Sequence, residues 1–168
     1  DSWLCRLEQA VSESGRFDET NFIIVSDHGH LKVDKQVNLN VLFKEEGLIQ
    51  TDDHGELVSY QAYCHSSGLS AQILLADAAD TEVRKKVEAI LEYAKDTEAF
   101  GIKAIYTRRE AEEKFQLSGP FEYVVEGVGG VAFAAKWDGR VVINEEDPDY
   151  DYVKTSHGHR PHLGPQPV

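Results

Sequence analysis

The chain has 168 residues, of which 41% are hydrophobic, and its 17 basic and 30 acidic side chains give a formal net charge of −13. A chain of this length and apolar content can bury one sizeable core, so we expect a single domain. The acidic balance argues against binding nucleic acid or an anionic membrane surface through bulk electrostatics, although it leaves open a small anionic substrate.

The two cysteines, Cys5 and Cys64, lack metal-motif spacing and are too few for a disulfide framework. We expect both to be reduced and buried, in a cytoplasmic protein, with secretion as the alternative if a signal peptide lies upstream. Apolar runs fall short of the ~18 residues of a membrane span, so no membrane partner is expected. The sequence has no methionine and opens within a helical pattern at Asp1, which indicates part of a larger protein.

The first predicted element is an amphipathic helix over residues 2–14. Its apolar side chains share one helical stripe, and Gly15 is a plausible stop. A continuous apolar run rich in β-branched residues follows at residues 22–26. Such a run is typical of a strand buried on both faces of a parallel α/β sheet.

Asp27 and His28 follow this predicted strand, and Gly29 allows a sharp turn. Open α/β sheets usually place their ligands at the carboxyl ends of central strands. A carboxylate beside a neutral imidazole is a mixed oxygen and nitrogen pair that suits zinc or manganese. The alternative is structural, with Asp27 capping the next segment and His28 an ordinary loop residue.

The middle of the chain alternates short predicted strands and helices. Residues 31–37 are predicted as loop, and residues 52–55 as a turn. The other expected elements are a short helix from Leu39 ended by Gly47, strands at 57–64, 70–76 and 102–106, a helix capped by Asp80, and a short helix opened by a capping box at residues 107–110.

The last third of the sequence is richer in strand patterns. Three short strands are predicted at residues 121–126, 131–137 and 140–144, with Asp138 and Gly139 forming a hairpin turn between the last two. The expected fold class is therefore α/β, with a smaller β-rich section inserted before the final loop. We place this mixed α/β insertion at about residues 50–150.

The closing segment, residues 156–162 (SHGHRPH), holds three histidines. Two prolines and Gly158 would shape it into a rigid loop, and the histidines favour metal binding over a polar loop in which they are incidental. The side chains of His157 and His159 diverge if the segment is extended, so both cannot be assumed to bind one ion.

The two ends of the chain together resemble a known family. Residues 20–29 (TNFIIVSDHG) closely resemble the first motif of the type I phosphodiesterase/nucleotide pyrophosphatase family, within the alkaline phosphatase superfamily. Residues 37–40 and 47–48 resemble the segment that follows it, and residues 156–158 with 161 and 164–168 resemble the family's late metal-binding loop. The resemblance implies that residues 1–168 form the C-terminal part of a larger catalytic domain, a portion of an alkaline-phosphatase-like α/β/α sandwich.

The resemblance also implies a two-metal site, with zinc favoured and manganese the alternative. Asp27 and His28 would bind the metal that also contacts the nucleophile, and His157 would bind the other. The remaining histidines near these motifs do not fall on ligand positions: His30, His159 and His162. The Thr or Ser nucleophile is expected upstream of this chain, so no catalytic residue is assigned here and the chain alone is expected to be inactive.

The implied function is metal-dependent hydrolysis of phosphodiester or nucleotide pyrophosphate bonds, through a covalent intermediate, in a small phosphate ester or nucleotide. Other activities of the same superfamily are alternatives, namely those of phosphomonoesterases, phosphonate hydrolases, sulfatases and phosphomutases. A different class of alternative is a non-catalytic α/β binding domain in which the Asp27–His28–Gly29 turn is structural.

Overall fold

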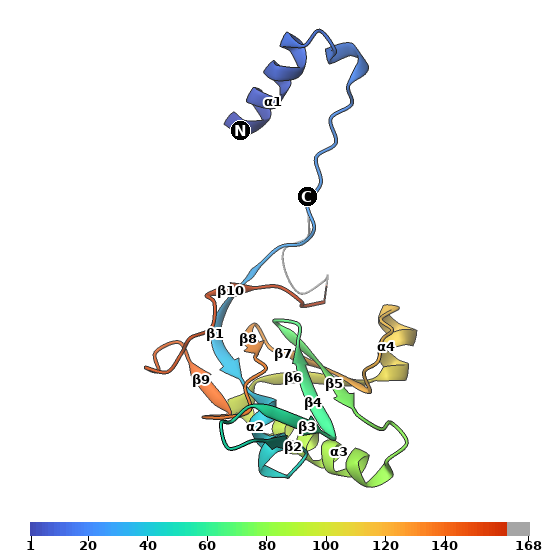
Figure 1. Ribbon diagram of the computed structural model, residues 1–168, viewed down its shortest axis with the longest axis vertical. Coiled ribbons are helices and arrows are strands. Elements are labelled where there is room, and N and C mark those ends of the chain that lie inside the picture. The colour runs from blue at the N-terminus through green and yellow to red at the C-terminus, as the bar shows by residue number, and fades with distance from the viewer. Residues whose placement is uncertain (161–168) are drawn as a thin grey trace.

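Two four-stranded β-sheets and a two-stranded sheet, with helices packed against them, form most of the computed structural model (Figure 1). The structure describes residues 1–160. Its helices are α1 (Ser2–Glu13), α2 (Leu39–Glu45), α3 (Thr81–Asp96) and α4 (Arg108–Phe115), with 3-10 turns at Phe17–Glu19 and Glu98–Phe100. Its strands are β1 (Leu31–Val37), β2 (Ile49–Thr51), β3 (Leu57–Tyr60), β4 (Ala62–Ser66), β5 (Ser70–Leu75), β6 (Ile102–Thr107), β7 (Tyr123–Gly127), β8 (Gly130–Phe133), β9 (Val142–Asn144) and β10 (Thr155–Ser156).

Strand β1 organises the first sheet. It pairs in parallel with β8, and in antiparallel fashion with β9 and β10. The predicted loop at residues 31–37 is therefore wrong. The strand is stabilised by hydrogen bonding to segments about a hundred residues away, which its locally polar sequence does not reveal.

The predicted hairpin at Asp138 and Gly139 is also wrong. Strands β8 and β9 do not pair with each other, because both pair with the same residues of β1 and so lie on its two sides. Gly139 still adopts a positive φ of 87°, so the chain does turn there.

The second sheet has the order β4-β5-β7-β6, and every neighbouring pair in it is antiparallel. The predicted strands at residues 70–76, 102–106 and 121–126 are confirmed here. The single strand predicted at 57–64 is divided between two sheets, since β3 pairs with β2 and β4 pairs with β5. Buried Ala71 and Ile73 alternate along β5 and point into the core.

One hydrophobic core joins both sheets to α2 and α3. Helix α3 begins at the predicted cap, where the Asp80 carboxylate accepts hydrogen bonds from the backbone N–H groups of Glu82 and Val83. The predicted apolar stripe of this helix is buried: Val83, Val87, Ile90, Leu91 and Ala94. The capping box of α4 is confirmed as well, since Thr107 and Glu110 satisfy each other's backbone N–H groups.

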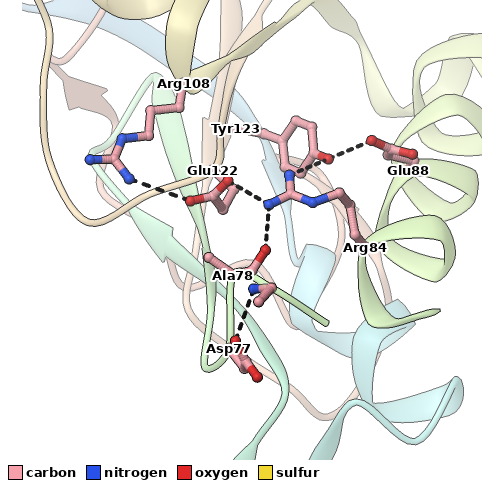
Figure 2. Close-up of polar contacts among 8 residues, drawn as sticks. Asp77, Ala78, Arg84, Glu88, Arg108, Glu122 and Tyr123 are labelled. Atoms are coloured by element: carbon pink, nitrogen blue, oxygen red, sulfur yellow. Dashed lines mark hydrogen bonds and ion pairs between the residues drawn. The ribbon is translucent and has the colours of Figure 1, made fainter. Parts of the chain in front are cut away.

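A polar network fastens α3 to the start of β7 (Figure 2). The Arg84 guanidinium donates to the Glu122 carboxylate at 2.7 Å, to the Tyr123 hydroxyl at 3.2 Å and to the Ala78 carbonyl at 2.8 Å. The Tyr123 hydroxyl in turn donates to Glu88 at 2.6 Å. Burial, followed by this bond to Glu88, raises the pKa of Tyr123 to about 12. The network replaces water around a half-buried ion pair and fixes the helix against the sheet.

The predicted helix at residues 2–14 is confirmed as α1, but the buried strand predicted at residues 22–26 is wrong in this structure. The segment is extended without strand pairing, and the side chain of Ile23 remains 83% exposed. Figure 1 shows it as the link between α1 and the packed sheets. The run is apolar enough for a buried strand, but among residues 1–160 no strand lies beside it.

Both cysteines are free, and only one matches the prediction of burial. Cys64 is buried in the core, whereas Cys5 is exposed on α1. Burial raises the pKa of the Cys64 thiol to about 12. Within residues 1–160, no helix is both long and apolar enough to cross a membrane.

Candidate metal-binding site

The short pairing of β1 with β10 brings the two histidine-containing ends of the chain together. Leu31 lies opposite Ser156, and Lys32 lies opposite Thr155. The backbone N–H of Val33 also donates to the Lys154 carbonyl at 2.8 Å. Because this ladder is antiparallel, the segment just before β1 and the segment just after β10 leave it on the same side.

Three imidazole rings gather where these segments leave the ladder. The rings of His28 and His157 stack with centroids 4.1 Å apart and planes at 21°. The ring of His30 lies 5.3 Å from that of His28 and 5.5 Å from that of His157. The hydroxyl of Thr155 lies 3.5 Å from Nδ1 of His30. The structure therefore brings together the first and last motifs and adds His30, which does not fall on a ligand position of the family motif.

Asp27 supplies a carboxylate beside these rings. Its Oδ1 accepts from the backbone N–H of His28 at 2.8 Å, and its Oδ2 lies 3.1 Å from Nε2 of the same histidine. The backbone hydrogen bond from His28 is the largest cause that lowers the pKa of Asp27, and the nearby rings of His28 and His157 add to it. The side chain is 82% exposed. A deprotonated, accessible carboxylate is suited to binding a cation.

The loop that carries His157 is held against the turn between β4 and β5. The backbone N–H of Leu69 donates to the His157 carbonyl at 2.8 Å, and the Ser70 hydroxyl donates to the Gly158 carbonyl at 2.6 Å. Gly158 has a φ of +89°, and a Cβ added there would overlap the carbonyl oxygen of Ser67. A glycine is therefore required at residue 158 for the close approach that holds His157 in place.

The donor chemistry of the cluster fits a divalent transition metal, because carboxylate oxygen and imidazole nitrogen are ligands that zinc and manganese accept. Within residues 1–160, however, no group of three or more histidine, cysteine or acidic side chains is arranged to hold an ion. The residues present fit as parts of a site that needs further ligands. The assignment of Asp27, His28 and His157 as ligands stays a prediction.

The other histidines of the closing segment do not join the cluster. His159 lines a separate cavity, and its Nδ1 atom is buried away from solvent. His162 lies outside the described residues, as do the residues 161 and 164–168 that contributed to the predicted late motif.

An ion pair that the sequence did not predict anchors the end of this loop. Arg160 forms an ion pair with Glu126 of β7, with Nε 2.8 Å from Oε1. Glu126 is only 3% exposed, which is unusual for a carboxylate and requires a paired charge. The one signal in the sequence was an acidic residue at the end of the apolar run 123–125.

The family model described as type I phosphodiesterase / nucleotide pyrophosphatase matches residues 1–160. In sequence, the chain matches no curated protein.

Several solved structures are similar to this chain. Human ectonucleotide pyrophosphatase/phosphodiesterase 5 is 17% identical with a TM-score of 0.61, over 95% of this chain and 35% of that protein. An inactive variant of murine ectonucleotide pyrophosphatase/phosphodiesterase 5, solved in complex with AMP, is 16% identical with a TM-score of 0.56, over 95% of this chain and 35% of that protein. Phosphonoacetate hydrolase from Sinorhizobium meliloti 1021 is 18% identical with a TM-score of 0.49, over 80% of this chain and 32% of that protein.

The likeness to the human protein confirms the predicted alkaline-phosphatase-like α/β fold. This chain spans about a third of the length of these solved relatives.

Proposed function

Because this chain belongs to the type I phosphodiesterase/nucleotide pyrophosphatase family, we propose that it is part of a metal-dependent hydrolase that cleaves phosphodiester or nucleotide pyrophosphate bonds. The observation that carries the proposal is the stacking of His28 on His157, at 4.1 Å, beside the Asp27 carboxylate. A structural role for the Asp27–His28–Gly29 turn gives no reason for the two motifs to meet.

In this proposal Asp27 and His28 hold one divalent ion and His157 holds a second. Such ions, zinc or manganese, would supply electrostatic stabilisation of the charge that develops on phosphoryl oxygens. The chain's own residues position these ligands. The β1–β10 ladder sets the separation of the two motifs, and the bond from Leu69 to the His157 carbonyl fixes the late loop.

The nucleophile is proposed to be a threonine or serine outside this chain, on which a covalent intermediate forms. We likewise propose that residues 1–168 are the C-terminal part of a larger catalytic domain and that further metal ligands lie outside them. This chain covers 35% of the solved human relative, which supports that division of the site. The chain alone would then be inactive.

A nucleotide or another small phosphate ester is the proposed substrate. Two observations support this class. The family is described by its phosphodiesterase and nucleotide pyrophosphatase activities, and a murine relative with the same fold has been solved in complex with AMP.

The test is hydrolysis of bis-p-nitrophenyl phosphate by the full-length protein with zinc or manganese added. We expect His28→Ala and His157→Ala each to abolish most of the activity. His54→Ala is the matched control, because His54 is an exposed histidine in the turn after β2. Activity that survives both substitutions in the cluster would overturn the proposal.

A further inference from the structure

Arg160, at the end of the late loop (residues 157–160), is held by side chains of β6, β7 and α4. Its Nε lies 2.8 Å from Oε1 of Glu126. Its guanidinium also lies over the rings of Tyr106 and Phe115, at 5.7 and 5.4 Å from their centroids. The Tyr106 hydroxyl donates to the second oxygen of the Glu126 carboxylate at 3.4 Å. The carboxylate and the two rings together define the position of the Arg160 side chain.

This ion pair lies beside a second attachment of the same loop. Ser70 of β5 is the register partner of Glu126 of β7, so their side chains project from the same face of the sheet. The Ser70 hydroxyl donates to the Gly158 carbonyl at 2.6 Å. The backbone N–H of Leu69 donates to the His157 carbonyl at 2.8 Å. The start of β5 and the end of β7 therefore hold both ends of the late loop.

The burial of Glu126 makes the ion pair a restriction on the loop. Only 3% of Glu126 is exposed, and a buried carboxylate without a cation beside it is strongly unfavourable. Buried ion pairs stabilise proteins no more, on average, than apolar side chains of similar size, so stability alone does not explain this one. Any arrangement of the loop that removes Arg160 leaves the carboxylate buried and unpaired. The pair thus favours one arrangement of the loop over others.

We propose that Arg160 is a positioning residue for the metal ion assigned to His157. The two residues are three positions apart, so at most about 11 Å of extended chain separates their Cα atoms. An anchor this near limits how far the His157 ring can move from its place beside His28, where the ring centroids are 4.1 Å apart. The inference rests on the proposed function, because it requires that His157 bind an ion. It adds a determinant of metal affinity outside the proposed ligands.

The test is calorimetric titration of the metal-free full-length protein with zinc. Arg160→Met keeps an apolar stem and removes the charge. We expect the dissociation constant of one zinc site to rise about tenfold, as the loss of a group that orients a ligand typically causes, with the other site unchanged. Hydrogen exchange at the Leu69 amide, measured without metal, should become about tenfold faster, because the acceptor of that amide is the His157 carbonyl.

Arg84→Met is the matched control. The side chains of Arg84 and Arg160 are 30% and 34% exposed, and Arg84 likewise pairs with a largely buried glutamate, Glu122, just before β7. Arg84→Met should lower the thermal stability to a similar extent as Arg160→Met. It should leave zinc affinity and exchange at Leu69 unchanged, because no contact of Arg84 involves the late loop.

Two further variants keep the test decisive if Arg160→Met folds poorly. Arg160→Lys restores a cation that can reach Glu126 and should recover part of the zinc affinity. Glu126→Gln keeps the shape of the side chain, removes its charge, and should shift both measurements in the same direction as Arg160→Met.

Unchanged zinc affinity and Leu69 exchange in Arg160→Met and Glu126→Gln, or losses that Arg84→Met reproduces, would overturn the positioning role. Hydrolysis of bis-p-nitrophenyl phosphate by the wild type, measured separately with zinc, shows whether the proposed function fails as well. An active wild type that binds zinc, with unchanged variants, refutes only the role of Arg160. A wild type that neither binds zinc nor hydrolyses the ester refutes both.

Discussion

The imidazole rings of His28 and His157 stack with their centroids 4.1 Å apart, although the residues lie near opposite ends of the chain. The contact follows from two residue pairs of the β1–β10 ladder, together with the hydrogen bonds that hold the late loop to the β4–β5 turn. Small changes in these supports should therefore affect the site without altering any of its proposed ligands.

Gly158→Ala should destabilise the protein and displace His157. The new Cβ would overlap the carbonyl oxygen of Ser67 in a backbone conformation with φ of +89°. Gly139→Ala is the matched control, because Gly139 has a φ of +87° with nothing within 4 Å of the added Cβ. We expect about 1 kcal/mol of destabilisation at Gly139 from backbone strain, and clearly more at Gly158.

Chemical denaturation measures both free energies of unfolding, and hydrolysis by the full-length variants reports on His157. Equal destabilisation by the two substitutions, with activity retained in Gly158→Ala, would show that the close packing at residue 158 does not position His157.

Arg84→Ala should lower the free energy of unfolding by about 1–3 kcal/mol, because it leaves the largely buried Glu122 carboxylate without its 2.7 Å partner. Arg108, at 3.6 Å from the same carboxylate, can compensate only in part. Lys85→Ala, one position along α3, removes an exposed ion pair with Glu82 and should cost no more than ~0.5 kcal/mol. Urea denaturation distinguishes the two, and equal costs would mean that the network in Figure 2 adds nothing to stability.

The Glu110 carboxylate of α4, bonded to Lys114 and to Thr107, should make stability fall in acid. Bonds from Lys114 and from Thr107 lower the pKa of Glu110 to about 2, from 4.5. Because the folded-state pKa is the lower one, this contribution is fully present above about pH 4.5 and is lost as the pH falls toward 2. Glu110→Gln should remove that part of the dependence in denaturation series at several pH values. An unchanged pH profile in Glu110→Gln would contradict this assignment.

The isolated chain, residues 1–168, should bind zinc weakly. Three proposed ligands must serve two ions, and among the described residues no three potential ligands converge on one point. Calorimetric titration with zinc should give a shallow curve. A tight, stoichiometric curve would show that the chain holds a complete site of its own.

Elements with strong local signals could be predicted from the sequence. Helix α3 combines the Asp80 cap with a full apolar stripe, and α4 combines Thr107 with Glu110 in a capping box, so both were located closely. In these cases the interactions that define the element lie within a few residues of one another, where a pattern can detect them.

Elements that depend on distant partners could not be predicted in the same way. Strand β1 carries Lys32, Asp34 and Lys35, and only its pairing with β8, β9 and β10 makes it a strand. The opposite error applies to residues 22–26, where the apolar run predicts a buried strand although no neighbouring strand is present within residues 1–160. The hydrophobicity of a segment indicates a preference for burial, but the presence of a neighbouring strand determines whether the segment is buried in a sheet.

For the candidate site, the motifs were identified from sequence and their meeting was inferred from family resemblance. The family is confirmed by the match over residues 1–160. The physical cause of the meeting, the β1–β10 ladder, was missed because residues 31–37 were predicted as loop. The anchor between Glu126 and Arg160 was missed too, since its two residues belong to different elements.

In the proposed site, Asp27 and His28 hold one metal ion and His157 holds another. The most direct test of this assignment is the metal content of the purified full-length protein after equilibration with zinc, compared with His28→Ala and His157→Ala. We expect about two ions per chain in the wild type and about one in each variant, as separate ligand sets require. Two ions retained in both variants, or none in the wild type, would contradict the assignment.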